Sequence, residues 1–225
     1  MNEFEEALLE WSKNTVDYLH TVVTNPENKE LDLSFYAFQT APKYKPNVIF
    51  LGINPGGKAY PYESLYKNPI WNLIEHNRMT PERFIQANPD IEKLETWKVW
   101  IKLKRFFEKY EFFNDYMLMN LIYFNTPNIH DLLRRKNGSA IFKKNVELTK
   151  DLLINVIQPK IIICLGTSCF DRLNIKSQVI LKGKKRLVVK GELNGIKVFG
   201  IPHPSGSFTS NEDKDRIGNT IFENI

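Results

Sequence analysis

The chain has little cysteine: Cys164 and Cys169 are its only two thiols. Two thiols argue against a disulfide framework, and they cannot supply the four thiolates of an iron–sulfur cluster or an all-thiolate zinc site. No pair of histidines or carboxylates stands at metal-ligand spacing either. We therefore expect a reducing compartment, no metal and no other cofactor.

Long apolar runs are also missing, because none reaches the roughly 18 residues that a membrane-spanning helix needs. The first residues, MNEFEEALLEW, are acidic and helical in pattern, whereas a secretory signal begins with basic residues. These features predict a soluble, cytoplasmic protein. The formal net charge of +5 is the sign expected of a protein that contacts phosphates.

The order of predicted elements favours an α/β fold. A chain of 225 residues with 42% hydrophobic content can bury one core, so we expect a single domain over residues 1–225. Apolar periodicity predicts helices at 2–23, 92–110, 139–157 and 211–225, and a loop region with a short helix at 60–89. Short apolar runs predict strands at 47–52, 116–124, 160–166, 186–190 and 196–202, the last two joined through the turn GELNG. This alternation predicts a three-layer α/β/α sandwich with a mostly parallel central sheet of four to five strands.

Three polar residues are placed at or within these strands. Asn54 follows the first strand, Asn120 lies inside the second, and His203 follows the fifth. Ligands of parallel sheets bind at the carboxyl ends of the strands, so we expect the three side chains to converge on one crevice.

Each of these residues has a structural and a functional interpretation. The stretch GINPGG lacks the lysine of a phosphate loop, so Asn54 either forms an Asn-Pro-Gly turn or takes part in a site. An unpaired amide inside an apolar strand costs about 1–3 kcal/mol, so Asn120 either bonds a neighbouring loop or reads a base. His203 stands between two prolines, which favours a positioned, functional side chain.

Two further features each have two interpretations. The aromatic residues Tyr60, Tyr62, Tyr66 and Trp71 either pack in the core or form a platform on which a base stacks. The basic run KGKKR at 182–186 is either a solvated face or part of a phosphate-binding surface.

Three separated motifs resemble those of the uracil-DNA glycosylase superfamily, and in the same order. They are GINPG at 52–56, the apolar strand with Asn120, and HPSG at 203–206. The run PKIIICLG at 159–166 is similar to the superfamily's central strand, and the likeness covers a core of about 47–210. An asparagine in the first motif resembles the mismatch-specific and single-strand-selective branches, whereas the iron–sulfur branches need cysteines that are absent here.

The resemblance implies a role for each matching residue. Asn54 would orient the attacking water, Asn120 would read the pyrimidine, and His203 would stabilise negative charge on the departing base. Backbone groups of Gly52, Ile53, Pro55 and Gly56 would contact the flipped base. Tyr66, or else Tyr62, would stack on it, Ser205 and Gly206 would meet the DNA phosphate, and Phe208 would fill the vacated stack. The third motif departs from the commoner form, which has a second proline where Gly206 stands.

The implied function is removal of uracil or a related deaminated base from DNA by a monomeric, monofunctional glycosylase of base excision repair. Cleaving an N-glycosidic bond needs charge stabilisation and a placed water more than a strong nucleophile, so an amide and an imidazole suffice. One alternative is a nucleic-acid-binding module of the same fold with little or no turnover. Another is a hydrolase of small nucleosides. The presence of all three polar residues favours the enzyme.

Overall fold

The computed structural model of the chain describes residues 1–23, 25–28, 32–33, 37–54, 80–125, 129–206 and 209–225. Its internal contacts divide the chain into two compact units that alternate along the sequence. The first unit holds Met1–Pro42, Ile53–Pro89 and Asn120–Ile157, and the second holds Lys43–Gly52, Asp90–Met119 and Gln158–Ile225. No helix in the described part of the chain is long and apolar enough to cross a membrane.

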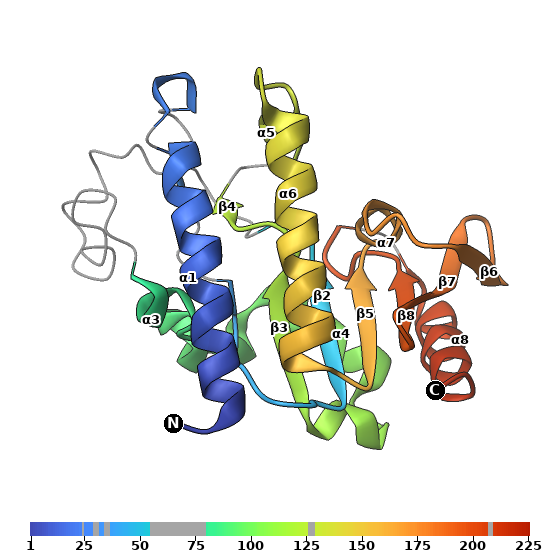
Figure 1. Cartoon of the computed structure of the whole chain (residues 1–225). Coiled ribbons are helices and arrows are strands. Elements are labelled where there is room, and N and C mark those ends of the chain that lie inside the picture. Colours follow the sequence, from blue (N-terminus) through green and yellow to red (C-terminus); the bar gives the residue numbers. More distant parts are fainter. Residues whose placement is uncertain (24, 29–31, 34–36, 55–79, 126–128, 207–208) are drawn as a thin grey trace. The chain divides into compact units, whose positions relative to one another are not determined.

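The central sheet has six strands (Figure 1). In spatial order they are β3 (Tyr116–Asn120), β2 (Val48–Gly52), β5 (Ile161–Leu165), β8 (Ile196–Ile201), β7 (Arg186–Leu193) and β6 (Ser177–Lys182). Strands β2, β5 and β8 run parallel, whereas β7 is antiparallel to both β8 and β6. The predicted α/β class with a mostly parallel sheet is confirmed. The predicted number of strands was too low, because the edge strand β6 was missed.

The turn between β7 and β8 has the predicted hairpin form. Leu193 pairs with Ile196, which leaves a two-residue loop of Asn194 and Gly195. Their φ angles are +50° and +85°, the left-handed values of a type I′ turn. Asparagine and glycine tolerate this conformation better than other residues, so the sequence determines the hairpin locally.

Helices of the second unit cover both faces of the sheet. On one face, Trp100 of α4 (Lys98–Phe107) and Ile217 of α8 (Asn211–Phe222) share a buried core with Phe199 of β8. The neighbouring residue, Gly200, points to the other face, where a Cβ on it would lie 2.6 Å from the Cβ of Phe170. Phe170 belongs to α7 (Thr167–Arg172), so glycine allows that helix to pack closely on the strand.

The C-terminal helix α8 forms as predicted, since the Ser210 side chain caps it by accepting a bond from the Asp213 amide at 3.1 Å.

The predicted continuous helix at 92–110 is wrong. A 3₁₀ helix, η2 (Pro89–Thr96), comes first, and α4 begins only at Lys98. Trp97 between them has an extended backbone (φ −71°, ψ 124°), which no helix can pass through. A second 3₁₀ helix, η3 (Glu111–Asn114), precedes β3.

The first unit is built mainly from helices. They are α1 (Glu3–Val23), α3 (Pro81–Phe84), α5 (Ile129–Leu133) and α6 (Gly138–Asp151), with the short turn η1 (Pro26–Asn28) and two paired two-residue strands, β1 (Asp32–Leu33) and β4 (Phe124–Asn125). Helix α6 continues as a π-helical segment, η4 (Leu152–Ile157). The predicted helices at 2–23 and 139–157 are therefore confirmed, although the second ends in a π-helix. Trp11 joins α1 to α6 by donating its indole N–H to the Leu148 carbonyl at 3.0 Å.

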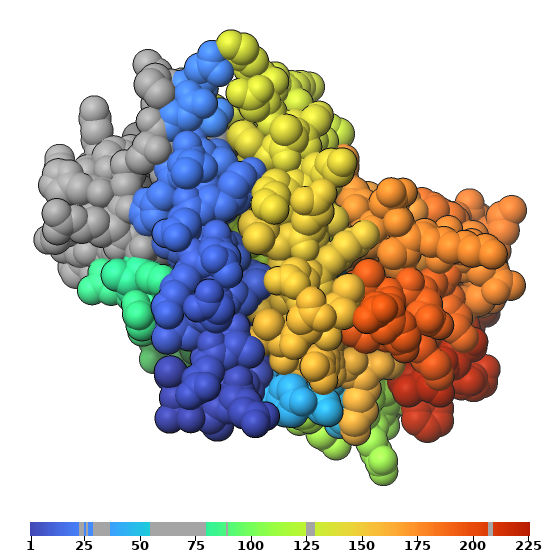
Figure 2. All heavy atoms as spheres, in the orientation of Figure 1, coloured from blue at the N-terminus to red at the C-terminus, as the bar shows by residue number. Residues whose placement is uncertain are grey.

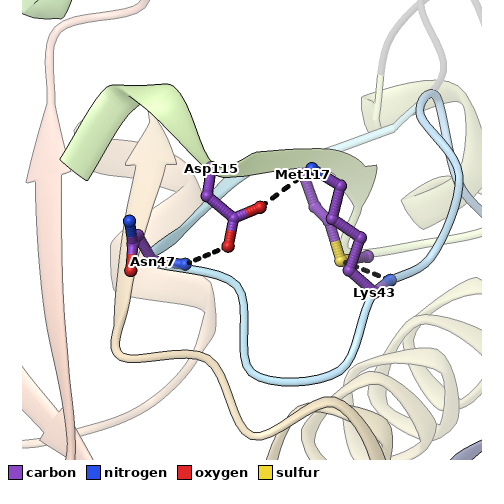
Figure 3. Close-up of polar contacts among 4 residues, drawn as sticks. All are labelled: Lys43, Asn47, Asp115 and Met117. Carbon is purple, nitrogen blue, oxygen red and sulfur yellow. Dashed lines mark hydrogen bonds and ion pairs between the residues drawn. The ribbon is translucent and has the colours of Figure 1, made fainter. Parts of the chain in front are cut away.

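Asp115 anchors the start of β2 in the second unit (Figure 3). Its carboxylate accepts a bond from the Lys43 ammonium at 2.8 Å and from the Asn47 backbone N–H at 3.3 Å. Its own carbonyl accepts from the Val48 N–H at 3.2 Å, and the Lys43 N–H donates to the sulfur of Met117 at 3.2 Å. These bonds fix where β2 begins and therefore where its carboxyl end lies.

Replacing Asp115 with alanine should lower the free energy of unfolding by about 1–2 kcal/mol, because a backbone N–H loses a charged acceptor. Lys43→Gln is the matched control, since it removes only a half-exposed ion pair and should cost less than about 1 kcal/mol. Urea denaturation of both variants measures the difference. An equal loss in both would show that the ion pair, and not the bond to Asn47, stabilises this loop.

Candidate functional site

Asn120 is the last residue of β3 and is only 5% exposed. Its backbone N–H donates to the Ala37 carbonyl at 3.4 Å. Its side-chain Nδ2 is fully buried, and no acceptor for it exists among the residues that the structure describes. A buried amide nitrogen without a partner is costly, so this group is a candidate for binding a ligand.

The chain after Asn120 is held by α6 through buried hydrogen bonds. The Tyr123 N–H donates to Asn145 Oδ1 at 3.2 Å, and the Thr149 hydroxyl donates to the Leu121 carbonyl at 2.8 Å. Since that hydroxyl has only one proton, the Tyr123 hydroxyl must be the donor in its 2.6 Å bond to Thr149. Burial raises the pKa of Tyr123, which keeps this donor protonated.

These bonds explain why the predicted strand at 116–124 ends early. Strand β3 ends at Asn120, and the backbone groups of Leu121 and Tyr123 bond to α6, so Asn120 lies at the carboxyl end of β3 and not inside it. This end of a strand is where ligands of α/β sheets bind.

The first motif follows β2 as a bend at Ile53 and Asn54. The Ile53 carbonyl accepts a hydrogen bond from the Ile122 N–H at 3.0 Å. This bond places the bend beside the segment that follows Asn120, within the first unit. Asn54 itself is half-buried.

His203 follows β8 by two residues and belongs to the second unit. Its Nδ1 accepts a bond from the Ser205 backbone N–H at 3.3 Å and lies 3.1 Å from the Ser205 hydroxyl. A backbone N–H can only donate, so Nδ1 of the neutral ring carries no proton and Nε2 does. Although the residue is exposed overall, partial burial of the ring lowers the pKa of His203 and favours this neutral form.

Gly166 brings the chain close to His203, although it was not among the residues predicted for the site. It has a φ of +112°, and its N–H donates to the Ile201 carbonyl at 2.9 Å. A Cβ on Gly166 would lie 3.8 Å from the Cβ of His203. The glycine directly after the buried run IIICL was the available signal, because a strand that turns sharply into a helix often needs positive φ.

The structure thus groups the predicted residues as follows. Ile53, Asn54 and Asn120 belong to the first unit, and Gly52, His203, Ser205 and Gly206 belong to the second. Pro55, Gly56, Tyr62, Tyr66 and Phe208 lie outside the described residues, as do Tyr60 and Trp71. In the described ranges no group of three His, Cys, Asp or Glu residues could hold a metal ion.

A comparison with known protein families assigns the chain to a family. The family model for the uracil DNA glycosylase superfamily matches residues 38–221. The chain belongs to the uracil DNA glycosylase superfamily. No curated protein in the comparison matches the chain. Members of this superfamily are in general hydrolases of N-glycosyl bonds, so membership suggests DNA glycosylase activity and DNA binding.

For this superfamily member we predict an NMR titration of His203 with a midpoint below the ordinary value of 6.5, because partial burial lowers its pKa. The folded protein binds this proton less readily than the unfolded chain does. Stability that is present above pH 6.5 is therefore lost as the pH falls through the lowered pKa. The His203→Gln variant lacks this group, so its free energy of unfolding should fall less than that of the wild type between pH 8 and pH 5. Parallel pH profiles of the two proteins would contradict the prediction.

Proposed function

We propose that this protein hydrolyses the N-glycosidic bond of uracil, or of a related deaminated base, in DNA. It acts as a monomeric, monofunctional glycosylase of the branch with asparagine in the first motif. The single observation that carries the proposal is the buried Nδ2 of Asn120 at the carboxyl end of β3, which has no acceptor among the residues that the structure describes. A flipped base supplies the missing acceptor.

The amide of Asn120 fits the edge of uracil. An amide offers two donors and one acceptor, and uracil presents the O4 acceptor beside the N3–H donor. Nδ2 donates to O4 while Oδ1 accepts from N3–H. The free energy lost by leaving Nδ2 unpaired, about 1–3 kcal/mol, is recovered only when a base is bound. This difference favours bases with a carbonyl at that position.

The oxygen of water bonds to C1′ of the sugar as the bond between C1′ and the base nitrogen breaks. The base leaves with the electron pair and carries negative charge until it takes up the proton that the water gives up. In the proposed assignment Asn54 orients the water, and the Nε2–H of neutral His203 donates to the O2 of the departing base. The bonds from Ser205 to His203 Nδ1 support this role, since they keep the donor proton on Nε2.

The remaining assignments concern the DNA and the base. Ser205 and Gly206 contact a phosphate next to the flipped nucleotide, and backbone groups of the first motif, Gly52, Ile53, Pro55 and Gly56, contact the base. Tyr66, or else Tyr62, stacks on the base, and Phe208 fills the space it leaves. Stacking of this kind contributes about 1–3 kcal/mol per base.

Labelled oligonucleotides test the proposal. They contain U:G, U:A, single-stranded U, hypoxanthine or xanthine, and abasic products are cleaved with alkali after incubation with the protein. We expect product from at least one uracil substrate. No product at large protein excess, together with retained DNA binding, would reject the glycosylase and favour a binding module of the same fold.

A further inference from the structure

The positive charge of the chain is concentrated in one short segment. Residues Arg172 to Lys190 include seven basic residues and no acidic residue. Since the whole chain carries +5, the rest of the chain carries a net charge of −2. The segment contains β6, the loop after it and the first part of β7, up to Lys190, and Figure 2 shows this orange region on the surface at the right.

The tip of the β6–β7 hairpin, residues Lys182 to Arg186, is well exposed. Lys182 pairs with Arg186, and the Gly183 N–H donates to the Lys185 carbonyl at 3.0 Å, which closes a three-residue loop. Lys182, Lys184 and Lys185 are all exposed. In the described structure no ion pair within 4.0 Å involves Lys182 or Lys184.

Arg186 anchors this tip to the body of the second unit. Its guanidinium makes two bonds to the carboxylate of Asp171 in α7, at 3.0 and 2.6 Å. The charge of Arg186 is therefore paired, and the bidentate geometry limits the movement of the loop beside it. The hairpin thus presents its lysines from a defined position.

The strand register places the tip at the same end of the sheet as His203. Because β7 is antiparallel to β8, the amino end of β7 lies at the carboxyl end of β8. Val189 of β7 pairs with Gly200 of β8. Arg186 precedes Val189 by three residues and His203 follows Gly200 by three residues, so both lie in the same direction from this pair. Strands lie about 4.8 Å apart, so β6 lies roughly 10 Å from β8. Both segments belong to the second unit.

We infer that the β6–β7 tip binds the DNA backbone beside the flipped nucleotide, with Lys182, Lys184 and Lys185 contacting phosphates. This inference rests on the proposed function, in which Ser205 and Gly206 contact DNA at the same end of the sheet. Phosphates along one strand are spaced by about 3.4 Å of helix axis per nucleotide, so a surface roughly 10 Å away meets phosphates a few nucleotides from the flipped one. The hairpin supplies sequence-independent affinity and leaves the chemistry to the other residues.

The test compares the double variant Lys182→Gln/Lys184→Gln with the wild type by fluorescence anisotropy on an undamaged duplex over a range of salt concentrations. Each phosphate contact contributes about 0.9 to the slope of log K against log salt. We expect the variant to reduce the magnitude of that slope by about 1.5–2 and to weaken binding at low salt by about tenfold or more.

The matched control is Lys45→Gln/Lys160→Gln. It removes the same charge from two exposed lysines that precede β2 and β5, at the amino ends of these strands. The control should keep the wild-type slope. Equal slopes for the hairpin variant and the control would overturn the inference. The inference would also be overturned if the hairpin variant lost binding to single-stranded RNA or to anionic vesicles while its DNA binding stayed unchanged.

The rate of uracil release separates this inference from the proposed function. At saturating protein the hairpin variant should release uracil at the wild-type rate, and it should need more protein to reach half of that rate. If the wild type releases no base but the hairpin variant still has a smaller slope of log K against log salt, the proposed function fails and the hairpin remains a DNA-binding surface. If base is released and the slope is unchanged, only the hairpin inference fails.

Discussion

Replacing Asn54 with alanine should reduce the single-turnover rate of uracil release by about 10²- to 10³-fold, the usual effect of removing one preorganised polar group from an active site. The affinity for DNA should stay within about twofold of the wild-type value, because the amide acts on the water and not on the backbone. The Ile53 carbonyl keeps its bond to Ile122 in this variant, so the bend itself is retained. Single-turnover kinetics and anisotropy measure the two quantities separately.

The control for Asn54→Ala is Asn114→Ala, which removes the same amide from an exposed position in η3. It should keep the wild-type rate. Asn54→Asp retains an oxygen that can accept a bond from water, so it should retain more activity than the alanine variant. Equal losses of rate and of DNA affinity in Asn54→Ala would point to structural damage and would contradict the assigned role.

The buried strands were the parts of the fold that the sequence predicted best. The runs at 48–52 and 161–165 are almost wholly buried, so their apolar character on both faces is visible without knowledge of their neighbours. The hairpin turn at Asn194 and Gly195 was also predictable, because its backbone conformation depends on those two residues alone.

Elements that depend on distant contacts were not predicted. Strand β6 is exposed along most of its length, and its apolar run, Val179 to Leu181, is only three residues long, so its structure depends on pairing with β7. The end of β3 at Asn120 depends on bonds to Asn145 and Thr149, which lie on a helix more than twenty residues away in sequence. The interruption at Trp97 is a backbone conformation that helical periodicity cannot reveal.

In the candidate site, too, some features could be predicted from the local sequence and others depend on contacts between distant residues. A polar side chain in or after an apolar strand is visible in the sequence, and this signal made Asn54, Asn120 and His203 the candidate residues. The features that support the proposed roles of Asn120 and His203 come from tertiary structure. Only the folded structure shows that Asn120 Nδ2 has no acceptor among the described residues and that Ser205 lies against His203 Nδ1. Gly166 has no polar side chain, so only its backbone geometry connects it with the candidate site.

Replacing Asn120 with leucine should lower the activity without lowering the stability of the protein. The variant removes a buried amide nitrogen that has no partner in the described structure, and it substitutes an apolar side chain of similar size. The free energy of unfolding should therefore stay within about 1 kcal/mol of the wild-type value or increase. The value of kcat/KM for uracil should fall by at least about 10²-fold, because the base loses both hydrogen bonds to the amide.

Asn145→Leu is the matched control, since Asn145 is also a buried asparagine. Its Nδ2 donates to the Ile141 carbonyl at 2.9 Å, and its Oδ1 accepts from the Tyr123 N–H at 3.2 Å. Its replacement leaves that N–H buried without an acceptor, so the free energy of unfolding should fall by about 1–3 kcal/mol. If Asn120→Leu were destabilised as much as Asn145→Leu, the Asn120 amide would be structural. A stable but inactive Asn120→Leu protein would instead support the substrate as the partner of Nδ2.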